Sequence, residues 1–163
     1  GPDDVMSVVY HLGTEALNLA GISNPEDRLR VAISDGSALD KFRQMVSAHG
    51  GLLDSIDDPD INQPKFREKV YAETDGYITG INTLKLGEAV VQLGGGRLQK
   101  EDVLDPTAGI IFYKKISDLV HAGEIILEYF CSDKEKLENV TGKLKKSAKI
   151  QTDLPIVHNI IYK

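Results

Sequence analysis

The sequence predicts an α+β protein in which an N-terminal helical segment precedes a C-terminal domain of strands and helices. Two observations carry this prediction. Apolar residues recur every three or four positions before residue 51, as in amphipathic helices, whereas β-branched and alternating runs dominate after residue 65. Charge divides the chain at the same place, because residues 1–64 carry 11 acidic and 4 basic side chains, and residues 65–163 carry 14 acidic and 15 basic ones.

Three helices are predicted in the helical segment. The first begins after Pro2, with acidic residues in its first turn, and ends before Gly21. The pair Asn24-Pro25 predicts the N-cap and the first residue of a second helix, and a third helix begins at Ser37.

Residues 52–64 contain two prolines and four aspartates, a composition typical of a linker. We therefore divide the chain into a helical segment, residues 1–51, a linker, residues 52–64, and a C-terminal domain, residues 65–163.

The C-terminal domain is predicted to contain two helices between its strands. Asn82 caps a short helix that ends near residue 93, and residues 133–146 form a second helix. Leu137, Val140 and Leu144 share the apolar face of this second helix. Strands are predicted at residues 66–72, 77–81, 109–115, 124–131 and 156–162.

Composition argues against several classes of function. The sequence has no apolar run of the roughly 18 residues that span a membrane, and its first 20 residues have no secretory pattern. With one cysteine, Cys131, in an apolar run, we expect a cytoplasmic protein with a buried thiol. The net charge of -6 argues against nucleic acid and anionic membranes as partners. No metal site is predicted, because separate predicted elements carry the four histidines, His11, His49, His121 and His158.

The most distinctive local motif is Gly94, Gly95, Gly96 and Arg97, which follows the apolar residue Leu93. Exposed backbone N–H groups beside a guanidinium can bind an anion such as phosphate. Three glycines after an apolar helix are also typical of a helix stop followed by a flexible loop. Taken alone, the residues favour the helix stop over phosphate contact.

Several further motifs occur in order along almost the whole chain. They are Gly1-Pro2-Asp3-Asp4, residues 37–42, residues 75–78, residues 93–97, Lys100-Glu101-Asp102, Ala108-Gly109-Ile110 and Lys114-Lys115. This series resembles the C-terminal part of the pyrimidine-nucleoside phosphorylases, the family that includes thymidine phosphorylase. The sequence departs from the family's pattern at three places. Gly95 replaces the usual alanine, Asp105-Pro106-Thr107 replaces a D-x-A-V segment, and Ser117 replaces a glycine.

The resemblance implies an enzyme of the pentosyltransferase class. In this family, phosphate attacks the anomeric carbon of thymidine or uridine and yields the free base and a pentose 1-phosphate, with phosphate as co-substrate and no cofactor. The family's phosphate loop and base-recognising residues have no counterpart in this chain, so we expect no catalytic residue here and no activity of the chain alone.

The resemblance also predicts the fold and the assembly. The C-terminal domain is expected to be an α/β-hammerhead, similar to a barrel-sandwich. The motif Gly94, Gly95, Gly96 and Arg97 is expected to form a mobile edge of the substrate cleft, which closes over the pyrimidine nucleoside and phosphate. The family is homodimeric, whereas we expect this chain by itself to be monomeric.

An alternative function comes from residues 117–125. They resemble the G-D-x-V-x-x-G-E turn of barrel-sandwich domains, which include biotinyl and lipoyl carriers. A carrier requires an acceptor lysine at a hairpin tip, and none of the lysines has the expected sequence neighbours. The alternative is therefore a non-catalytic, stand-alone binding or carrier-like module.

Overall fold

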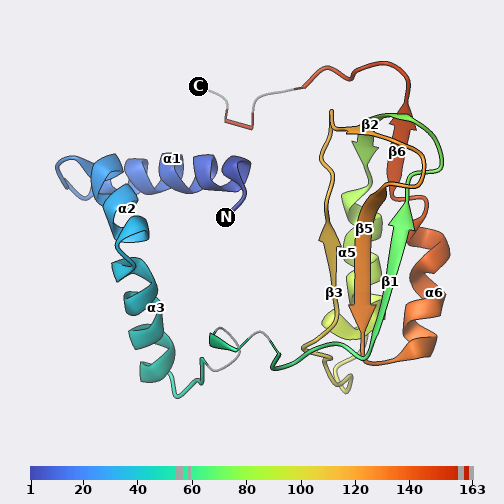
Figure 1. Cartoon of the computed structure of the whole chain (residues 1–163). Coiled ribbons are helices and arrows are strands. Elements are labelled where there is room, and N and C mark those ends of the chain that lie inside the picture. The colour runs from blue at the N-terminus through green and yellow to red at the C-terminus, as the bar shows by residue number, and fades with distance from the viewer. Residues whose placement is uncertain (54–56, 59, 158–159, 162–163) are drawn as a thin grey trace. The chain divides into compact units, whose positions relative to one another are not determined.

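The computed structural model describes residues 1–53, 57–58, 60–157 and 160–161 (Figure 1). Of the predicted linker, residues 54–56 and 59 lie outside the described residues. Contacts divide the chain into two compact units, of which the first is Gly1–Asp58 with the end of the chain and the second is Pro59–Val157. Within the described ranges, none of the helices has the length and apolar character needed to cross a membrane.

Unit 1 contains the three helices that the spacing of apolar residues predicts. They are α1 (Asp3–Leu19), α2 (Pro25–Ser34) and α3 (Ser37–Ala48). Helix α1 crosses α2 closely at Gly13, where a Cβ atom would lie 2.8 Å from Leu29 Cδ1. The missing side chain at Gly13 therefore allows the two helices to approach each other.

The start of α2 agrees with the sequence prediction only in part. Pro25 is the first helical residue, as predicted. The predicted side-chain cap is wrong, because Asn24 has a left-handed backbone with φ of 52° and its side chain makes no capping hydrogen bond. A capping side chain needs an extended backbone, and the tight turn before α2 removes that geometry.

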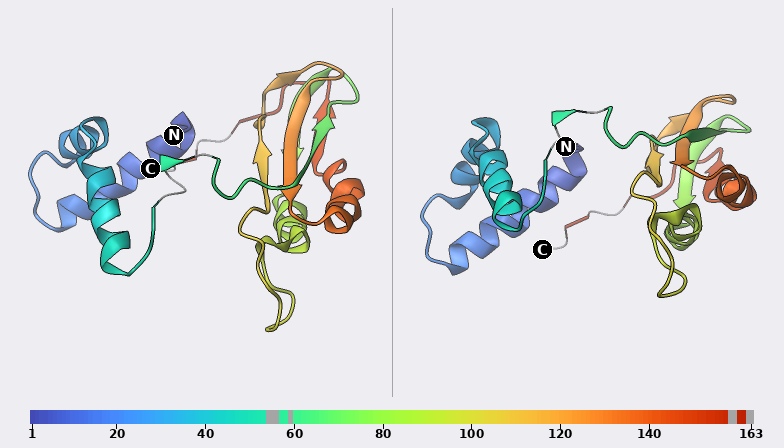
Figure 2. Two further views of the ribbon diagram at one scale, coloured as in Figure 1. Left: turned by 60° about the horizontal axis from the view of Figure 1, so that its bottom comes forward. Right: turned by 90° about the horizontal axis from the view of Figure 1, so that it is seen from below.

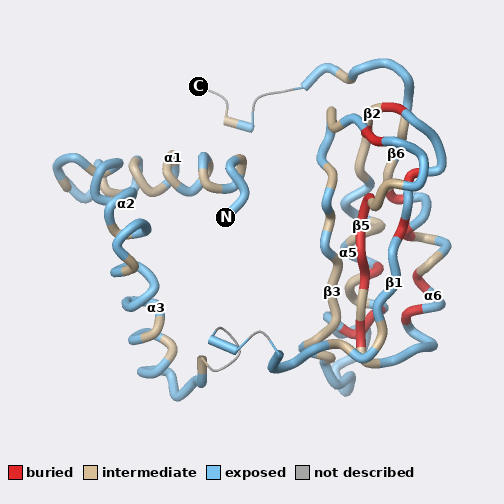
Figure 3. Tube along the Cα trace, in the orientation of Figure 1, coloured by how far each residue is buried: buried red, intermediate tan, exposed pale blue. Residues whose placement is uncertain are grey.

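The helices of unit 1 enclose no buried core of their own. None of their residues is buried, and Figure 3 shows α1, α2 and α3 only in the colours of intermediate and exposed residues. Large apolar side chains remain 42–90% exposed on all three helices. Examples are Val5, Leu12, Leu19, Val31, Phe42 and Met45.

Unit 2 contains two antiparallel sheets of three strands each (Figure 1). Sheet A has the order β1 (Phe66–Tyr71), β5 (Ile125–Cys131) and β3 (Gly109–Phe112). Sheet B has the order β4 (Leu119–Val120), β2 (Gly76–Ile81) and β6 (Ala148–Gln151). The consecutive strands β1 and β2 belong to different sheets, and the described strands do not close into a barrel.

Two helices cover one face of sheet A (Figure 2). They are α5 (Thr83–Val90) and α6 (Lys134–Leu144). The predicted cap of α5 is confirmed, because Asn82 Oδ1 accepts a hydrogen bond of 3.0 Å from Lys85 N. Asp133 caps α6 in the same way and accepts from Glu135 N at 2.9 Å.

The main core of unit 2 lies between sheet A and its two helices. Alternate residues of β5 point toward the helices, as the two-residue period of a strand requires. The side chains that α6 was predicted to bury are indeed buried, and the thiol of Cys131 is fully buried as expected. Each large apolar side chain placed there stabilises the fold by about 1.5–3 kcal/mol. The buried members are Val70, Ala89, Leu93, Leu127, Tyr129, Cys131, Leu137, Val140 and Leu144.

A smaller core joins the two sheets. Its buried members are Ala72, Ile78, Val120 and Ile126, and Phe112 packs against both this core and the main one. The two sheets are therefore parts of one packed unit.

The predicted C-terminal strand is wrong for the part of it that the structure describes. Residues 156–157 and 160–161 form no strand, and residues 158, 159 and 162 of the predicted range lie outside the description. The last strand among the described residues is β6, which pairs with β2. Ile156, Val157 and Ile160 are β-branched, but their side chains are 61–85% exposed and no neighbouring strand pairs with them.

Candidate functional site

The glycine-arginine loop, defined here as residues 94–106, projects from unit 2 beyond the ends of α5 and β3 (Figure 2). Helix α5 runs into a short π-helical turn, η1 (Val91–Gly95), and the helical conformation ends at Gly94, which has φ of 107°. The helix thus stops within the glycine triplet, and the chain leaves in an extended conformation at Gly96.

All three glycines have a neighbouring side chain close to the position that a Cβ atom would occupy. A Cβ atom at Gly94 would lie 3.1 Å from the Cβ of Asp105. At Gly95 it would lie 2.9 Å from Val90 Cγ1, and at Gly96 2.8 Å from Val91 Cγ2. The loop therefore begins by folding back tightly over the last turn of the helix, which larger residues would obstruct.

The base of the loop is tied together by Asp105. Its backbone N–H donates to Gly94 O at 2.9 Å, which closes the two ends of the loop. Its carboxylate accepts from Thr107 N at 2.9 Å, from Thr107 Oγ1 at 2.6 Å and from Ser132 N at 2.7 Å. Burial opposes ionisation, but hydrogen bonds from Thr107 and Ser132 outweigh it and lower the pKa of Asp105.

The outer part of the loop has a turn of its own. Asp102 Oδ2 accepts hydrogen bonds from Gln99 N at 2.9 Å and from Leu98 N at 2.8 Å, and these bonds lower the pKa of Asp102. Leu98 and Val103 leave 73% and 88% of their surfaces exposed, and Arg97 is exposed as well. The loop therefore presents a cation and apolar side chains on an internally braced turn.

Of the residues predicted for the site, Gly94 is buried and Gly96 is partly buried, whereas Gly95 and Arg97 are exposed. This arrangement leaves the guanidinium in solvent at the start of the projecting segment. Sequence reasoning missed the part played by Asp105, because its partner Ser132 lies 27 residues away and no local pattern connects them.

The turn that resembles barrel-sandwich domains joins the two sheets of unit 2. Ser117, which stands where the family pattern has glycine, has φ of 79° and donates its N–H to Ile78 O at 2.8 Å. Glu124 forms an ion pair with Lys114 and accepts from His121 N, and both interactions lower the pKa of Glu124. The left-handed backbone at Ser117 gives a physical reason for a glycine at this place.

The described histidines, His11, His49 and His121, belong to no candidate metal site. Within the described ranges, no group of three or more histidine, cysteine or acidic residues has a geometry that could hold a metal ion. His11 lies on α1, His49 follows α3 and His121 lies in the turn after β4. The fourth, His158, falls outside the described residues.

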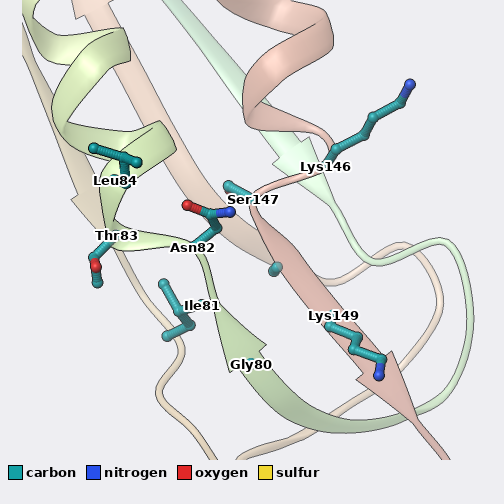
Figure 4. Close-up of a pocket in the computed structure, with 9 residues that line it drawn as sticks. Gly80, Ile81, Asn82, Thr83, Leu84, Lys146, Ser147 and Lys149 are labelled. Carbon is teal, nitrogen blue, oxygen red and sulfur yellow. The ribbon is translucent and has the colours of Figure 1, made fainter.

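A surface pocket of about 510 Å³ lies where the start of α5 meets β6 (Figure 4). Two of its polar side chains are bonded within the protein: Asn82 Oδ1 accepts from Lys85 N, and Ser147 Oγ donates to Leu144 O. Figure 4 shows Lys146 and Lys149 pointing away from each other. The pocket therefore lacks the converging charges that hold an anionic substrate.

Comparison with known proteins places this domain in a family. Residues 77–151 match the model of the pyrimidine nucleoside phosphorylase C-terminal domain. The chain is 33% identical to the pyrimidine-nucleoside phosphorylase of Staphylococcus haemolyticus and 36% identical to that of Staphylococcus epidermidis, over 99% of this chain and 39% of each relative. It is 31% identical to the pyrimidine-nucleoside phosphorylase of Geobacillus stearothermophilus, over 99% of this chain and 38% of the relative.

The chain thus spans about two fifths of the length of the curated relatives that it matches. The family match over residues 77–151 includes the glycine-arginine loop, the Asp105 contacts and strands of both sheets, whereas β1 precedes it. We conclude that residues 77–151 are a pyrimidine nucleoside phosphorylase C-terminal domain and that the chain belongs to the pyrimidine-nucleoside phosphorylase family, whose C-terminal part it resembles.

Proposed function

We propose that this chain works as the C-terminal part of an enzyme that phosphorolyses pyrimidine nucleosides. Thymidine or uridine and phosphate would yield the free base and a pentose 1-phosphate, without a metal or an organic cofactor. The similarity to proteins named pyrimidine-nucleoside phosphorylase supports this proposal. We assign bond breaking to residues outside this chain, because a phosphate and a departing base require converging cations and N–H groups.

The glycine-arginine loop is the contribution that we assign to this chain. A loop that is tied at its base and projects from the domain is suited to closing a cleft. We propose that the chain turns out of the helix at Gly94, that Gly95 and Gly96 allow the loop to bend, and that Arg97 faces the bound substrates when the cleft is closed. The observation that carries this proposal is that Arg97 is exposed and lies three residues after Gly94, where the helical conformation ends.

We also propose the assembly in which this part acts. The helical segment of residues 1–51 and the domain of residues 65–163 are joined by the linker of residues 52–64, and the two sheets of the domain form a hammerhead-like arrangement. The complete enzyme is a cytoplasmic homodimer, whereas the chain by itself is a monomer. Measuring the mass of the chain in solution tests the last point, and a stable dimer would contradict it.

A chimera tests the function. This chain replaces the region of the Geobacillus stearothermophilus relative that it matches, and release of uracil and thymine from the nucleosides is followed in phosphate buffer. We expect phosphorolysis by the chimera and none by this chain alone, even at high concentration. Turnover by the chain alone would contradict the assignment of the chemistry to other residues, and a folded but inactive chimera would contradict the proposed function.

Arg97→Ala in the same chimera tests the loop. We expect a lower kcat without loss of folding, because the substitution removes a cation from the projecting segment. The matched control is Lys100→Ala, which removes another exposed cation from the same loop. An unchanged kcat in Arg97→Ala would show that the loop is only a helix stop.

A further inference from the structure

We propose that Asp105 is a positioning residue that fastens both ends of the glycine-arginine loop to the core of unit 2, so that the segment between them moves as one arm. For its effect on turnover, this inference rests on the proposed function. Its structural part stands on contacts within this chain and is tested separately.

The first observation is that the two ends of the loop, Gly94 and Asp105, are bonded to each other, and we call this pair the neck of the loop. The hydrogen bond from Asp105 N to Gly94 O joins residues that lie 11 positions apart in the sequence. Gly94 is buried with a positive φ, and a Cβ atom there would lie only 3.1 Å from the Cβ of Asp105. The two ends of the loop therefore meet at one point beside the core.

The second observation is the attachment of this neck to the junction of β5 and α6. Ser132 N donates to Asp105 Oδ2 at 2.7 Å, and Ser132 follows directly after the fully buried Cys131. Asp133, the next residue, caps α6. The carboxylate of Asp105 thus links the loop to the two elements that carry most of the main core.

The third observation is that the carboxylate has several donors at once. Thr107 donates through both its N–H and its hydroxyl group, and the Thr107 and Ser132 hydroxyl oxygens lie 2.9 Å apart. Hydrogen bonds to an ionised acceptor are stronger than neutral ones, particularly where the acceptor is partly buried. The lowered pKa of Asp105 agrees with a charged acceptor at neutral pH.

Beyond the neck, Asp102 braces the loop. Its pKa is lowered by hydrogen bonds from Gln99 N and Leu98 N within the loop and by the charge of Lys136 on α6. Asp102 bonds to backbone N–H groups of the same loop, and Leu98 and Val103 are largely exposed. An internally braced segment on a fixed neck bends where it has no side chains, which is at Gly95 and Gly96. Asp105 therefore determines where the arm begins and in which direction it projects.

Amide hydrogen exchange on the whole chain tests the fastening. In Asp105→Asn, we expect the N–H groups of Ser132 and Thr107 to exchange about tenfold faster, because a charged acceptor becomes neutral. The matched control is Asp102→Asn, which should leave exchange at Ser132 unchanged because Asp102 accepts its hydrogen bonds from Leu98 N and Gln99 N and makes none to Ser132. Unchanged exchange at Ser132 in Asp105→Asn would overturn the proposal.

Thr107→Val provides a second test if Asp105→Asn does not fold. It removes the hydroxyl donor to Asp105 but keeps the backbone N–H and a similar side-chain shape. We expect faster exchange at Ser132 in this variant too, and unchanged exchange would overturn the proposal.

Kinetics of the chimera test the positioning role. We expect Asp105→Asn to lower kcat more than it raises the KM for uridine, since a misdirected arm impairs closure after the substrate has bound. Faster exchange with an unchanged kcat would overturn the role in turnover. An inactive chimera with wild-type Asp105 would instead contradict the proposed function and leave the exchange result as the test of the fastening.

Discussion

Arg67 Nη1 and Glu128 Oε1 lie 2.9 Å apart across the adjacent strands β1 and β5, although 61 residues separate them in the sequence. Tyr113 donates its hydroxyl group to the other oxygen of Glu128 at 3.2 Å. The Arg67 guanidinium also lies 5.0 Å from the ring centre of Phe130, within the range of a cation–π contact. All these groups lie on the face of sheet A opposite the two helices, where Glu128 is buried.

Replacing Glu128 by glutamine is expected to destabilise the domain by about 1 kcal/mol. Glutamine keeps the shape of the side chain but loses the charge that Arg67 and Tyr113 contact, and solvent at Arg67 reduces the effect. Urea denaturation measured by circular dichroism gives the change in the free energy of unfolding. Glu138→Gln is the control, because its ion pair with Lys134 is 3.7 Å long and mostly exposed, and its removal should cost less than about 0.5 kcal/mol. Equal losses in the two variants would contradict the prediction.

The same carboxylate predicts a dependence of stability on pH. The hydrogen bond from Arg67 lowers the pKa of Glu128 below its ordinary value near 4.5 and outweighs the opposing effect of burial. The stabilisation is therefore complete above the unfolded-state pKa and is lost as the pH falls through the folded-state pKa. In melting experiments from about pH 7 to about pH 3, the difference in Tm between wild type and Glu128→Gln should shrink on acidification. A difference that stays constant or grows would show that the charge is not its source.

Truncating a core leucine tests the packing of α6 on sheet A. Leu144 is fully buried, so Leu144→Ala should reduce the free energy of unfolding by about 2–5 kcal/mol through lost burial and a residual cavity. Leu84→Ala is a matched control on α5, because Leu84 is 72% exposed. That variant should differ from wild type by no more than about 0.5 kcal/mol. Similar losses in both variants would contradict the assigned core.

Two glycine substitutions separate a backbone requirement from general helix propensity. Gly94→Ala should destabilise the domain by at least about 1 kcal/mol, since Gly94 has a positive φ and a Cβ atom there would also crowd the Asp105 side chain. Gly142→Ala should stabilise it by about 0.5–1 kcal/mol, because Gly142 lies in α6 with open space around the position of a Cβ atom. Thermal unfolding measures both changes, and a stabilising Gly94→Ala would disprove the strained turn.

The thiol of Cys131 should be inert in the native protein. Burial raises the pKa of this thiol, and Sγ donates to Asp133 O at 3.0 Å. Because the thiolate is the reactive form, Ellman's reagent should react slowly with the native chain at neutral pH and completely in denaturant. Equally rapid reaction in both conditions would place the thiol at the surface.

Sequence reasoning was most accurate where the controlling interactions are local. Helices α1 to α3 were predicted from apolar spacing and proline positions, and the Asn82 cap involves Lys85, only three residues away. The described part of the strand predicted near the C-terminus, residues 156–157 and 160–161, is not a strand, because β-propensity without a neighbouring strand does not make a sheet. Strand β6 was missed because its four residues carry a weak local pattern and depend on pairing with β2.

By itself, the sequence determined the α+β class, the helices of unit 1, the apolar faces of unit 2 and, through motifs in order, the family. Such features depend on residues within a few positions of one another. Only the tertiary structure decided that β1 and β2 lie in different sheets, that Arg67 contacts Glu128 and that Asp105 fastens the loop through Ser132. These contacts join distant segments, and their geometry follows from strand register and the packing of the whole core.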